Sequence, residues 1–476
     1  MSVQLIIIIL YFALTVGIGL YSKKSAKDSN SFHGAGLGVV MCVCASTGEW
    51  LGGTATTGVS EYGFDFGISG SWYTISNGIG VIFLALLFAK LYRSMETVTV
   101  PGIIGRFLGV KARTVSSVFL TFVMLAVGTS QMIAAGSLGV SLMGINFNLA
   151  VTAFAIVFIV YTLAGGMQAV AYTNIMHLIC MYGGVILAIV LALHKIGGMG
   201  VVSATLPGSY FNMASIGMPK VSSWIIASLL GACTAQAGIQ PILAAKDVHV
   251  AKKAAIITAF VAAPFGLFTA LLGMIAKTMS LSGTLLNTAG EVVTNGKLAL
   301  PTLMMNLSPV AGGIVLASIL AAILSTVSPI ILASGTMVTK DIYQGVIRPH
   351  ASDAEVMRMS RITTAISGVI CAGVAIFLNS SGIRVLDIVY FAYSMRGALF
   401  VIVLLGIYWK KTSEKGAVYG MVATALVGFF WVAYNAVTGQ FPIPGVTETY
   451  ISVFTALVTT LIFSLIFKKD AATVVK

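Results

Sequence analysis

One polar stretch that contains a carboxylate interrupts a strongly apolar part of the chain. Residues 45–57 read Ala-Ser-Thr-Gly-Glu-Trp-Leu-Gly-Gly-Thr-Ala-Thr-Thr and follow the apolar residues 39–44. A helix that crosses lipid satisfies its backbone internally, so glycine-rich polar sequence at membrane depth indicates a helix that breaks there and turns free carbonyls toward a cavity. An ionisable side chain at that depth is costly, and Glu49 is therefore predicted to be functional.

A second group of residues has the chemistry of a cation site. Ala322, Ser325 and Thr326 are spaced i, i+3 and i+4, which places them on one face of a helix. A backbone carbonyl and two hydroxyls are neutral oxygen ligands, and such ligands suit a small alkali cation. Serine and threonine in membrane helices also bond to their own backbone or bridge neighbouring helices, so these residues alone leave both interpretations open.

The composition indicates which elements position these residues. Of the 476 residues, 58% are hydrophobic and 9% are charged, and the mean hydropathy is +1.00. Soluble domains have about 25% charged residues. The apolar runs are about 20 residues long, which is the length of a membrane-crossing helix. The sequence therefore predicts an all-α polytopic membrane protein without a soluble domain, and no arrangement of residues typical of an enzyme.

The hydropathy pattern predicts thirteen transmembrane helices. The spans are roughly 3–21, 37–62, 70–92, 114–139, 145–164, 169–193, 221–244, 254–276, 310–338, 359–379, 384–409, 416–437 and 449–467. The first span lacks a basic region before it, so no cleavable signal peptide is expected.

The basic residues fall mostly on one side of these spans. With the amino terminus outside, 21 of the 27 lysines and arginines are cytoplasmic and five are external, while Arg396 lies within a span. This bias predicts a multi-pass protein of the cell membrane, with an external amino terminus and a cytoplasmic carboxyl terminus. It also accounts for the net charge of +13, so nucleic acid is not an expected partner.

Several stretches resemble one protein family in their order and spacing. They are residues 161–174, residues 240–253, Thr339-Lys-Asp-Ile-Tyr343, residues 320–328 and the Thr-Val-Pro segment near Val100. From about residue 30 to about residue 415 the chain resembles the sodium/solute symporter family. The resemblance implies sodium-coupled transport of a small polar organic solute, and it does not identify that solute.

The resemblance also implies a fold, a LeuT-type core of two inverted five-helix repeats. The repeats would be residues 37–193 and 221–409. Residues 1–36 would add one amino-terminal helix and its loop, and residues 410–476 two carboxyl-terminal helices and a tail. The first helix of each repeat is broken near the bilayer midplane in this family, so residues 45–57 would be the first break and the glycine-rich polar part of 221–244 the second.

A sodium site is implied between the first break and the serine- and threonine-bearing helix. The matching residues are Ala45, Gly48, Ala322, Ser325 and Thr326, and Na⁺ is the expected coupling ion. Some members have a second sodium site, built from an acid and two serines. This chain has Asn174 at the position of the acid, Ser328 at one serine position and Pro329 at the other. We therefore expect one sodium ion per cycle.

Glu49 and Arg396 would face each other in this fold, because the first and tenth core helices border the central cavity. Arg396 lies about twelve residues, or about 18 Å, from either end of its span. Three hypotheses remain open. The two residues form a structural ion pair. Alternatively, they hold the two ends of a zwitterion, with Arg396 on the carboxylate and Glu49 on the ammonium group. Or Glu49 carries a proton instead of or beside sodium, since burial favours a neutral carboxyl group.

Other polar and aromatic residues complete the candidate substrate site. The full set is Thr47, Glu49, Gly52, Trp72, Asn77, Gln131, Gln236, Tyr393 and Arg396. We expect a symporter that imports an amino-acid-like zwitterion or a carboxylate by alternating access and that functions as a monomer in the lipid bilayer. The alternatives are a proton-coupled transporter of the same fold that uses Glu49, and a transporter-like membrane sensor that acts through a separate partner.

Overall fold

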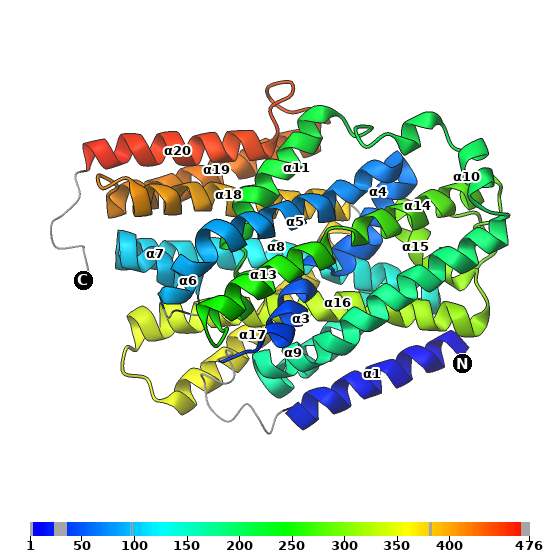
Figure 1. Ribbon diagram of the computed structural model, residues 1–476, viewed down its shortest axis with the longest axis horizontal. Coiled ribbons are helices and arrows are strands. Elements are labelled where there is room, and N and C mark those ends of the chain that lie inside the picture. The colour runs from blue at the N-terminus through cyan, green and yellow to red at the C-terminus, as the bar shows by residue number, and fades with distance from the viewer. Residues whose placement is uncertain (1–2, 23–35, 96, 98, 380–382, 468–476) are drawn as a thin grey trace.

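The helices run mostly along the long axis of the molecule, and the loops gather at its two ends (Figure 1). The computed structural model describes residues 3–22, 36–95, 97, 99–379 and 383–467. The predicted loop after the first span and the carboxyl-terminal tail lie largely outside these residues. The amino-terminal helix begins at one end of the bundle and the last helix ends at the other, as an odd number of spans requires.

The helices have the following bounds. The first part of the chain contains α1 (Val3–Ser22), α3 (Val39–Trp50), η2 (Thr54–Gly58), α4 (Val59–Phe66), η3 (Gly67–Ser71), α5 (Trp72–Phe83), η4 (Leu84–Phe88), α6 (Ala89–Ser94), α7 (Val100–Leu108), α8 (Val110–Met143) and α9 (Phe147–Ile196). The second part contains α10 (Met199–Thr205), η5 (Gly208–Phe211), α11 (Met218–Gly231), η6 (Ala232–Thr234), α12 (Gln236–Leu243), α13 (Val248–Ala262), α14 (Phe265–Leu281), α15 (Gly296–Met305), α16 (Pro309–Met337), η7 (Val338–Ile347), α17 (Asp353–Leu378), α18 (Val385–Tyr408), α19 (Glu414–Thr438) and α20 (Glu448–Ile466).

The prediction of an all-helical polytopic membrane protein is confirmed. Among the described residues, nine helices are long and apolar enough to cross a membrane, and a tenth is added if the bent pair α11–α12 is one span. Three shorter apolar helices accompany them, Val3–Thr15, Val39–Trp50 and Phe147–Leu163. The count of thirteen spans stays a prediction.

The chain breaks where the polar stretch predicts. α3 ends at Trp50, the chain leaves the helix at Leu51 and Gly52, and the π-helical turn η2 begins at Thr54. Gly52 has no room for a side chain, because a Cβ there would lie 2.2 Å from Thr326 Oγ1 and 2.7 Å from Gln131 Oε1. A glycine at this point therefore lets the break approach two other helices closely.

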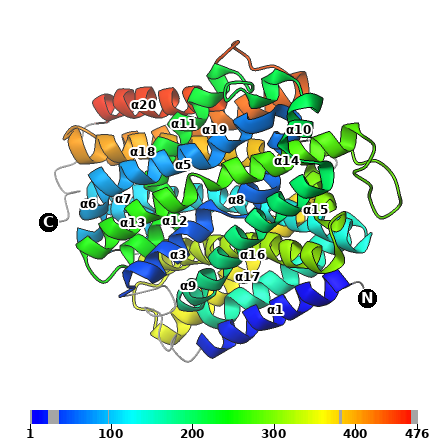
Figure 2. The ribbon, with the colours of Figure 1, turned by 45° about the vertical axis from the view of Figure 1, so that its right-hand side comes forward.

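The second predicted break is also present. α11 continues through the short η6, the chain leaves the helix at Ala235, and α12 departs at 43° to the preceding segment. The two broken helices touch, because Ser46 Oγ donates to the Gly238 carbonyl at 2.8 Å. Figure 2 shows α3 beside α12, with α16 close to it, and α3 contacts both helices.

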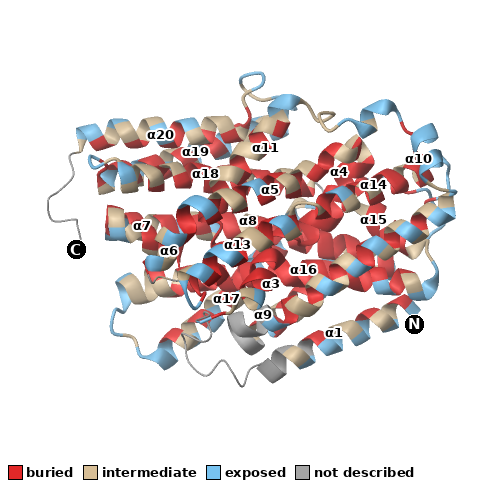
Figure 3. Ribbon diagram, in the orientation of Figure 1, coloured by how far each residue is buried: buried red, intermediate tan, exposed pale blue. Residues whose placement is uncertain are grey.

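α16 is the central helix of the bundle. In the most apolar 18-residue stretch of the continuous helix Pro309–Ile347, 94% of the residues are buried. α16 packs against α1, α3, α8, α9 and α17. Figure 3 shows the buried residues concentrated around it and the exposed residues on the outer helices and loops. A helix that is apolar all round belongs in the interior of a large protein, and its few hydroxyls then face other helices.

α9 (Phe147–Ile196) is continuous, but it is not straight. The Tyr161 and Thr173 hydroxyls form a hydrogen bond. In a straight helix two residues at this spacing would lie about 18 Å apart. The predicted tight turn at Gly165-Gly166 falls in this interval, whose side chains from 164 to 171 lie outside the described ones. The contact therefore agrees with two antiparallel spans, Phe147–Leu163 and Tyr172–Ile196.

Candidate functional site

Oxygen atoms of α3 and α16 meet beside the first break. The Thr326 hydroxyl donates to the Gly48 carbonyl, and Ser325 Oγ donates to the Ala322 carbonyl at 2.8 Å. Ala45 lies one turn before Gly48 on α3 and is fully buried. The structure therefore brings four of the five predicted sodium ligands into two direct contacts and places the fifth on the adjacent turn. In both contacts a hydroxyl group donates to a backbone carbonyl oxygen. If the hydroxyl rotated away, that oxygen could bind a cation.

Gly48 is the point of closest approach between α3 and its neighbours. A Cβ added there would lie 2.3 Å from Asn174 Nδ2 and 2.7 Å from the Ser325 carbonyl oxygen. The second of these atoms belongs to the backbone, so it cannot rotate aside. The spacing of α3 and α16 at the predicted sodium site therefore depends on the absence of a side chain at residue 48.

Replacing Gly48 by alanine is expected to abolish sodium-dependent stabilisation of the protein. The added methyl group forces α3 from α16, which separates the Gly48 carbonyl from Thr326 and costs about 1–3 kcal/mol as overpacking. The measurement is the unfolding temperature with and without sodium. Gly183→Ala on the lipid-facing side of α9 is the control, because a Cβ there meets nothing within 4 Å. A wild-type sodium response in Gly48→Ala would contradict the expected geometry.

Asn174 lies against the same oxygen atoms but carries no charge. Its Nδ2 donates to the Ser325 carbonyl at 3.4 Å. Within the described part of the chain, Asn174 Oδ1 and the buried Ser328 Oγ have no hydrogen-bond partner. His177, one turn along α9, hydrogen-bonds through Nδ1 with the Tyr11 hydroxyl of α1. This neighbourhood offers amide, hydroxyl and imidazole groups where a second sodium site would need a carboxylate.

Glu49 and Arg396 form an ion pair in the interior of the bundle. Arg396 Nη1 donates to Glu49 Oε1 at 3.3 Å, and both side chains have an exposed fraction of 0%. Among the described residues, Glu49 Oε2 and the Nε and Nη2 atoms of Arg396 have no hydrogen-bond partner. Buried polar atoms are costly when they are unpaired. The contact therefore uses one carboxylate oxygen and leaves one whole edge of the guanidinium group unused.

Aromatic rings hold the Arg396 guanidinium in place. Its Cζ atom lies 3.9 Å from the centroid of the Tyr393 ring and 5.8 Å from that of Trp50. Tyr73 stacks on Tyr393 with centroids 6.0 Å apart, and their hydroxyls are 3.0 Å apart. The faces of aromatic rings attract a cation, so these two rings stabilise the guanidinium at this position before any ligand arrives.

Three further candidates lie in the interior with unused hydrogen-bonding capacity. The Thr47 hydroxyl, both polar side-chain atoms of Asn77 and Gln131 Oε1 are buried and without partners in the described residues. Gln131 Nε2 donates to Thr54 Oγ1 at 2.6 Å, which ties α8 to the first break. Their role in substrate binding stays a prediction, and the structure leaves these atoms available for it.

Two predicted substrate ligands each use one polar side-chain atom in a contact with the backbone of a connecting segment. Trp72 is only partly buried, and its Nε1 donates to the Met213 carbonyl in the loop between η5 and α11 at 2.8 Å. Gln236 Oε1 accepts from the Val100 amide at 2.7 Å, at the start of α7. Trp72 was predicted as an aromatic residue near the site, and Gln236 as part of the polar interruption in residues 221–244. Their role in substrate binding stays a prediction.

A buried hydroxyl cluster next to Tyr73 was not predicted. Ser76 Oγ lies 3.0 Å from Ser228 Oγ and 3.3 Å from the Tyr390 hydroxyl, and Trp224 stacks on Tyr390 with centroids 4.1 Å apart. Helical spacing would have indicated it, since Ser76 follows Tyr73 by three residues and Ser228 follows Trp224 by four. The cluster extends the aromatic group from α18 to α5 and α11.

Ion pairs close the structure on the side that carries the predicted outer loops. Lys220 Nζ lies 3.1 Å from Asp387 Oδ1 and 2.7 Å from the Tyr62 hydroxyl, which itself donates to Asp387 at 2.6 Å. Arg384 pairs with Asp65 at 3.0 Å. These contacts join α4 and α11, one segment of each broken helix, to the start of α18.

The fold and the site define a class of protein. Two helices broken at facing positions, a central hydroxyl-bearing helix and an enclosed polar centre are the features of a secondary transporter of the LeuT-like fold. Comparison with a solved structure agrees. The chain matches a substrate-bound, outward-open Na⁺-coupled sialic acid symporter with a TM-score of 0.79 and 17% identity, over 98% of this chain and 99% of that one.

The family follows from sequence comparison. The model of the sodium:solute symporter family matches residues 31–424. The chain is 25% identical over 491 aligned positions to the osmoregulated proline transporter OpuE of Bacillus subtilis, covering 99% of this chain and 96% of that protein. It is 23% identical over 460 positions to the sodium/glucose cotransporter of Vibrio parahaemolyticus, covering 90% and 84%. The chain belongs to the sodium:solute symporter family, and it is a sodium-coupled membrane transporter of a small solute, not an enzyme.

Proposed function

We propose that the protein imports one small zwitterionic solute together with one sodium ion in each cycle. The observation that carries the proposal is the incomplete pairing of Glu49 with Arg396. The free Nε and Nη2 atoms form one edge of the guanidinium group. Such an edge binds a carboxylate through two parallel hydrogen bonds. The free Oε2 atom of Glu49 can accept from the ammonium group of the same solute.

Glu49 and Arg396 then have two roles: they pair with each other when no solute is bound, and they bind the solute when it is present. Without solute, Arg396 and Glu49 compensate each other's charge, which lowers the cost of burying both. With solute, the two charges gain the partners they lack, and the aromatic group around Tyr393 excludes water. A sugar without charge would leave both residues as they are, so zwitterions fit this centre better than neutral solutes do.

Sodium would bind where α3 and α16 touch. The proposed ligands are Ala45, Gly48, Ala322, Ser325 and Thr326. Because Glu49 follows Gly48 directly, an ion that fixes the Gly48 carbonyl also fixes the backbone that carries Glu49. This shared segment gives sodium and solute a physical reason to bind together. The neutral Asn174 supports one ion per cycle rather than two.

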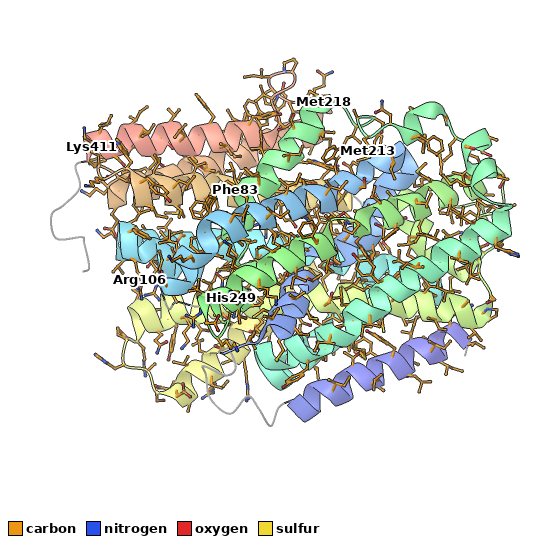
Figure 4. All side chains as sticks on the ribbon, viewed as in Figure 1. Phe83, Arg106, Met213, Met218, His249 and Lys411 are labelled. Carbon is orange, nitrogen blue, oxygen red and sulfur yellow. The ribbon has the colours of Figure 1, made fainter. Side chains whose placement is uncertain are left out.

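The proposed orientation places the basic loops in the cytoplasm. Figure 4 shows Arg106 and Lys411 at one end of the bundle and Met213 toward the other. The amino-terminal helix begins at the end away from the basic loops. This separation supports an external amino terminus and a cytoplasmic carboxyl terminus in the cell membrane. We also propose that the protein functions as a monomer.

A thermal-shift screen of the purified protein tests the proposed substrate class. Amino acids, sugars, carboxylates and nucleobases are added in sodium or in potassium buffer, and the unfolding temperature is measured. A ligand at about 100 times its dissociation constant stabilises the folded state by about 2.7 kcal/mol. We expect a zwitterion to raise the unfolding temperature in sodium and much less in potassium. Stabilisation by sugars or nucleobases alone would contradict the substrate class. An effect that depends on pH and not on sodium would favour proton coupling through Glu49.

A further inference from the structure

A second charged cluster lies on the face that carries the basic loops. Asp341 in η7 is fully buried, and its Oδ1 accepts from Arg113 Nε and Nη2, each at 2.8 Å, and from the Thr99 hydroxyl at 3.0 Å. Arg113 Nη2 also donates to the Lys340 carbonyl at 3.1 Å. The sodium and solute sites use none of these residues. The cluster joins the inner end of the α16–η7 helix to α8 and to the segment before α7.

The start of α7 is bound on a second side as well. Thr99 caps α7 by accepting from the Gly102 amide at 3.0 Å. The next residue, Val100, donates its amide to Gln236 Oε1 at 2.7 Å. Gln236 is the first residue of α12, directly after the second break. The first turn of α7 therefore connects the inner half of one broken helix to the helix that carries Ser325 and Thr326.

We infer that Thr99, Arg113, Gln236 and Asp341 form an inner latch, which holds the basic face closed and opens when solute leaves by that face. Rocking of one helix group against the other must move α12 or α16 relative to the connecting helices. The latch is the place where α7 and α8 hold both of them. Ser325 and Thr326 precede Asp341 by about four helical turns, so sodium and the latch hold the same helix at two levels.

The burial of Asp341 makes the latch a two-state device. Asp341 Oδ2 has no hydrogen-bond partner in the described residues, and Oδ1 depends on Arg113 and Thr99. Removing Arg113 from a buried carboxylate leaves an uncompensated charge unless water enters at the same time. A partly opened latch is therefore disfavoured, and the closed and hydrated forms are the two stable states.

A second ion pair on the same face provides the comparison. Arg348 Nη1 lies 3.3 Å from Glu355 Oε1, but their side chains are 63% and 44% exposed. Pairs of this kind contribute little to stability, because water already solvates both charges. Loss of the Arg348–Glu355 pair should therefore leave the inner face as closed as before.

Cys233 provides a native reporter of opening. It is fully buried in η6, three residues before Gln236, and its carbonyl accepts from the Tyr92 hydroxyl at 3.0 Å. Inside-out membrane vesicles are treated with a membrane-impermeant maleimide in sodium-free buffer without solute, and alkylation at Cys233 is quantified by mass spectrometry. We expect Asp341→Asn to accelerate alkylation about tenfold or more, since hydrogen bonds to the charged group are lost. Glu355→Gln should react at the wild-type rate.

A second pair of variants decides the question if Asp341→Asn does not fold. Thr99→Val removes the hydroxyl that donates to Asp341, and Thr99→Ser keeps it. The inference expects faster alkylation of Cys233 in Thr99→Val and the wild-type rate in Thr99→Ser. Wild-type alkylation in whichever of Asp341→Asn and Thr99→Val is folded would overturn the latch, as would equal acceleration by Glu355→Gln.

Discussion

Uptake by the Glu49→Gln variant is expected to fall at least about a hundredfold. The substitution removes the carboxylate that, among the described residues, accepts a hydrogen bond from Arg396, whose side chain is fully buried. Breaking one side of a buried pair costs about 3–5 kcal/mol, because the other charge stays uncompensated. The proposed ammonium acceptor is lost at the same time. The measurement is sodium-driven uptake into proteoliposomes of the zwitterion that the thermal-shift screen identifies, together with the unfolding temperature of the variant.

A double variant separates folding from transport. Glu49→Gln with Arg396→Gln removes both buried charges, so the unfolding temperature should recover toward the wild-type value. If the two residues bind the solute, uptake stays abolished in spite of this recovery. If they form only a structural pair, uptake returns with stability. Wild-type uptake by the double variant would therefore contradict the proposed substrate site.

The pH dependence of uptake by Glu49→Gln tests the hypothesis that Glu49 carries a proton. Glutamine cannot take up a proton as glutamate does, so a proton-coupled carrier would lose its pH dependence in Glu49→Gln. A sodium-coupled carrier would lose uptake without such a change in its pH profile. Uptake by Glu49→Gln that equals the wild type, with unchanged dependence on sodium and pH, would rule out both functional roles of this residue.

The features fixed by lipid and by helical spacing could be predicted from the sequence. A membrane helix tolerates an interruption only where it faces protein or water, and this constraint located the first break, while the second followed from the resemblance to a family with inverted repeats. The spacing of Ala322, Ser325 and Thr326 placed them on one face, and the structure presents that face to Gly48. The Glu49–Arg396 contact followed from the resemblance to a known fold, since the two residues are 347 positions apart in the chain.

The contacts of connecting segments could not be predicted in this way. Trp72 binds a carbonyl 141 positions away and Gln236 an amide 136 positions away, and no local pattern specifies either partner. Asp341 and Arg113 are 228 positions apart and belong to segments that were expected to be loops. Such pairs depend on how the ends of helices meet, and helix ends vary with small changes in length and tilt.

Replacing Ser325 and Thr326 together by alanine is expected to lower sodium affinity about a hundredfold or more. Two of the five proposed ligands lose their oxygen atoms, and each hydrogen bond to a charged partner contributes about 1.5–3 kcal/mol. Stability without sodium should change little, since Ser325 Oγ donates to the Ala322 carbonyl of its own helix at 2.8 Å and its other contact is the weak acceptor Met181 Sδ at 3.9 Å. Ser334→Ala is the matched control, because its hydroxyl is buried on the same helix and donates to the Ile330 carbonyl at 2.9 Å.

Binding of radioactive sodium to the purified protein, in the absence of any solute, tests the central claim most directly. The account predicts saturable binding of one ion per chain, displaced by unlabelled sodium and not by potassium. It also predicts that the Ser325→Ala/Thr326→Ala protein loses this binding while Ser334→Ala keeps it. Saturable binding of the same affinity in the double variant, or no saturable binding to the wild-type protein, would contradict a sodium site between the first break and α16.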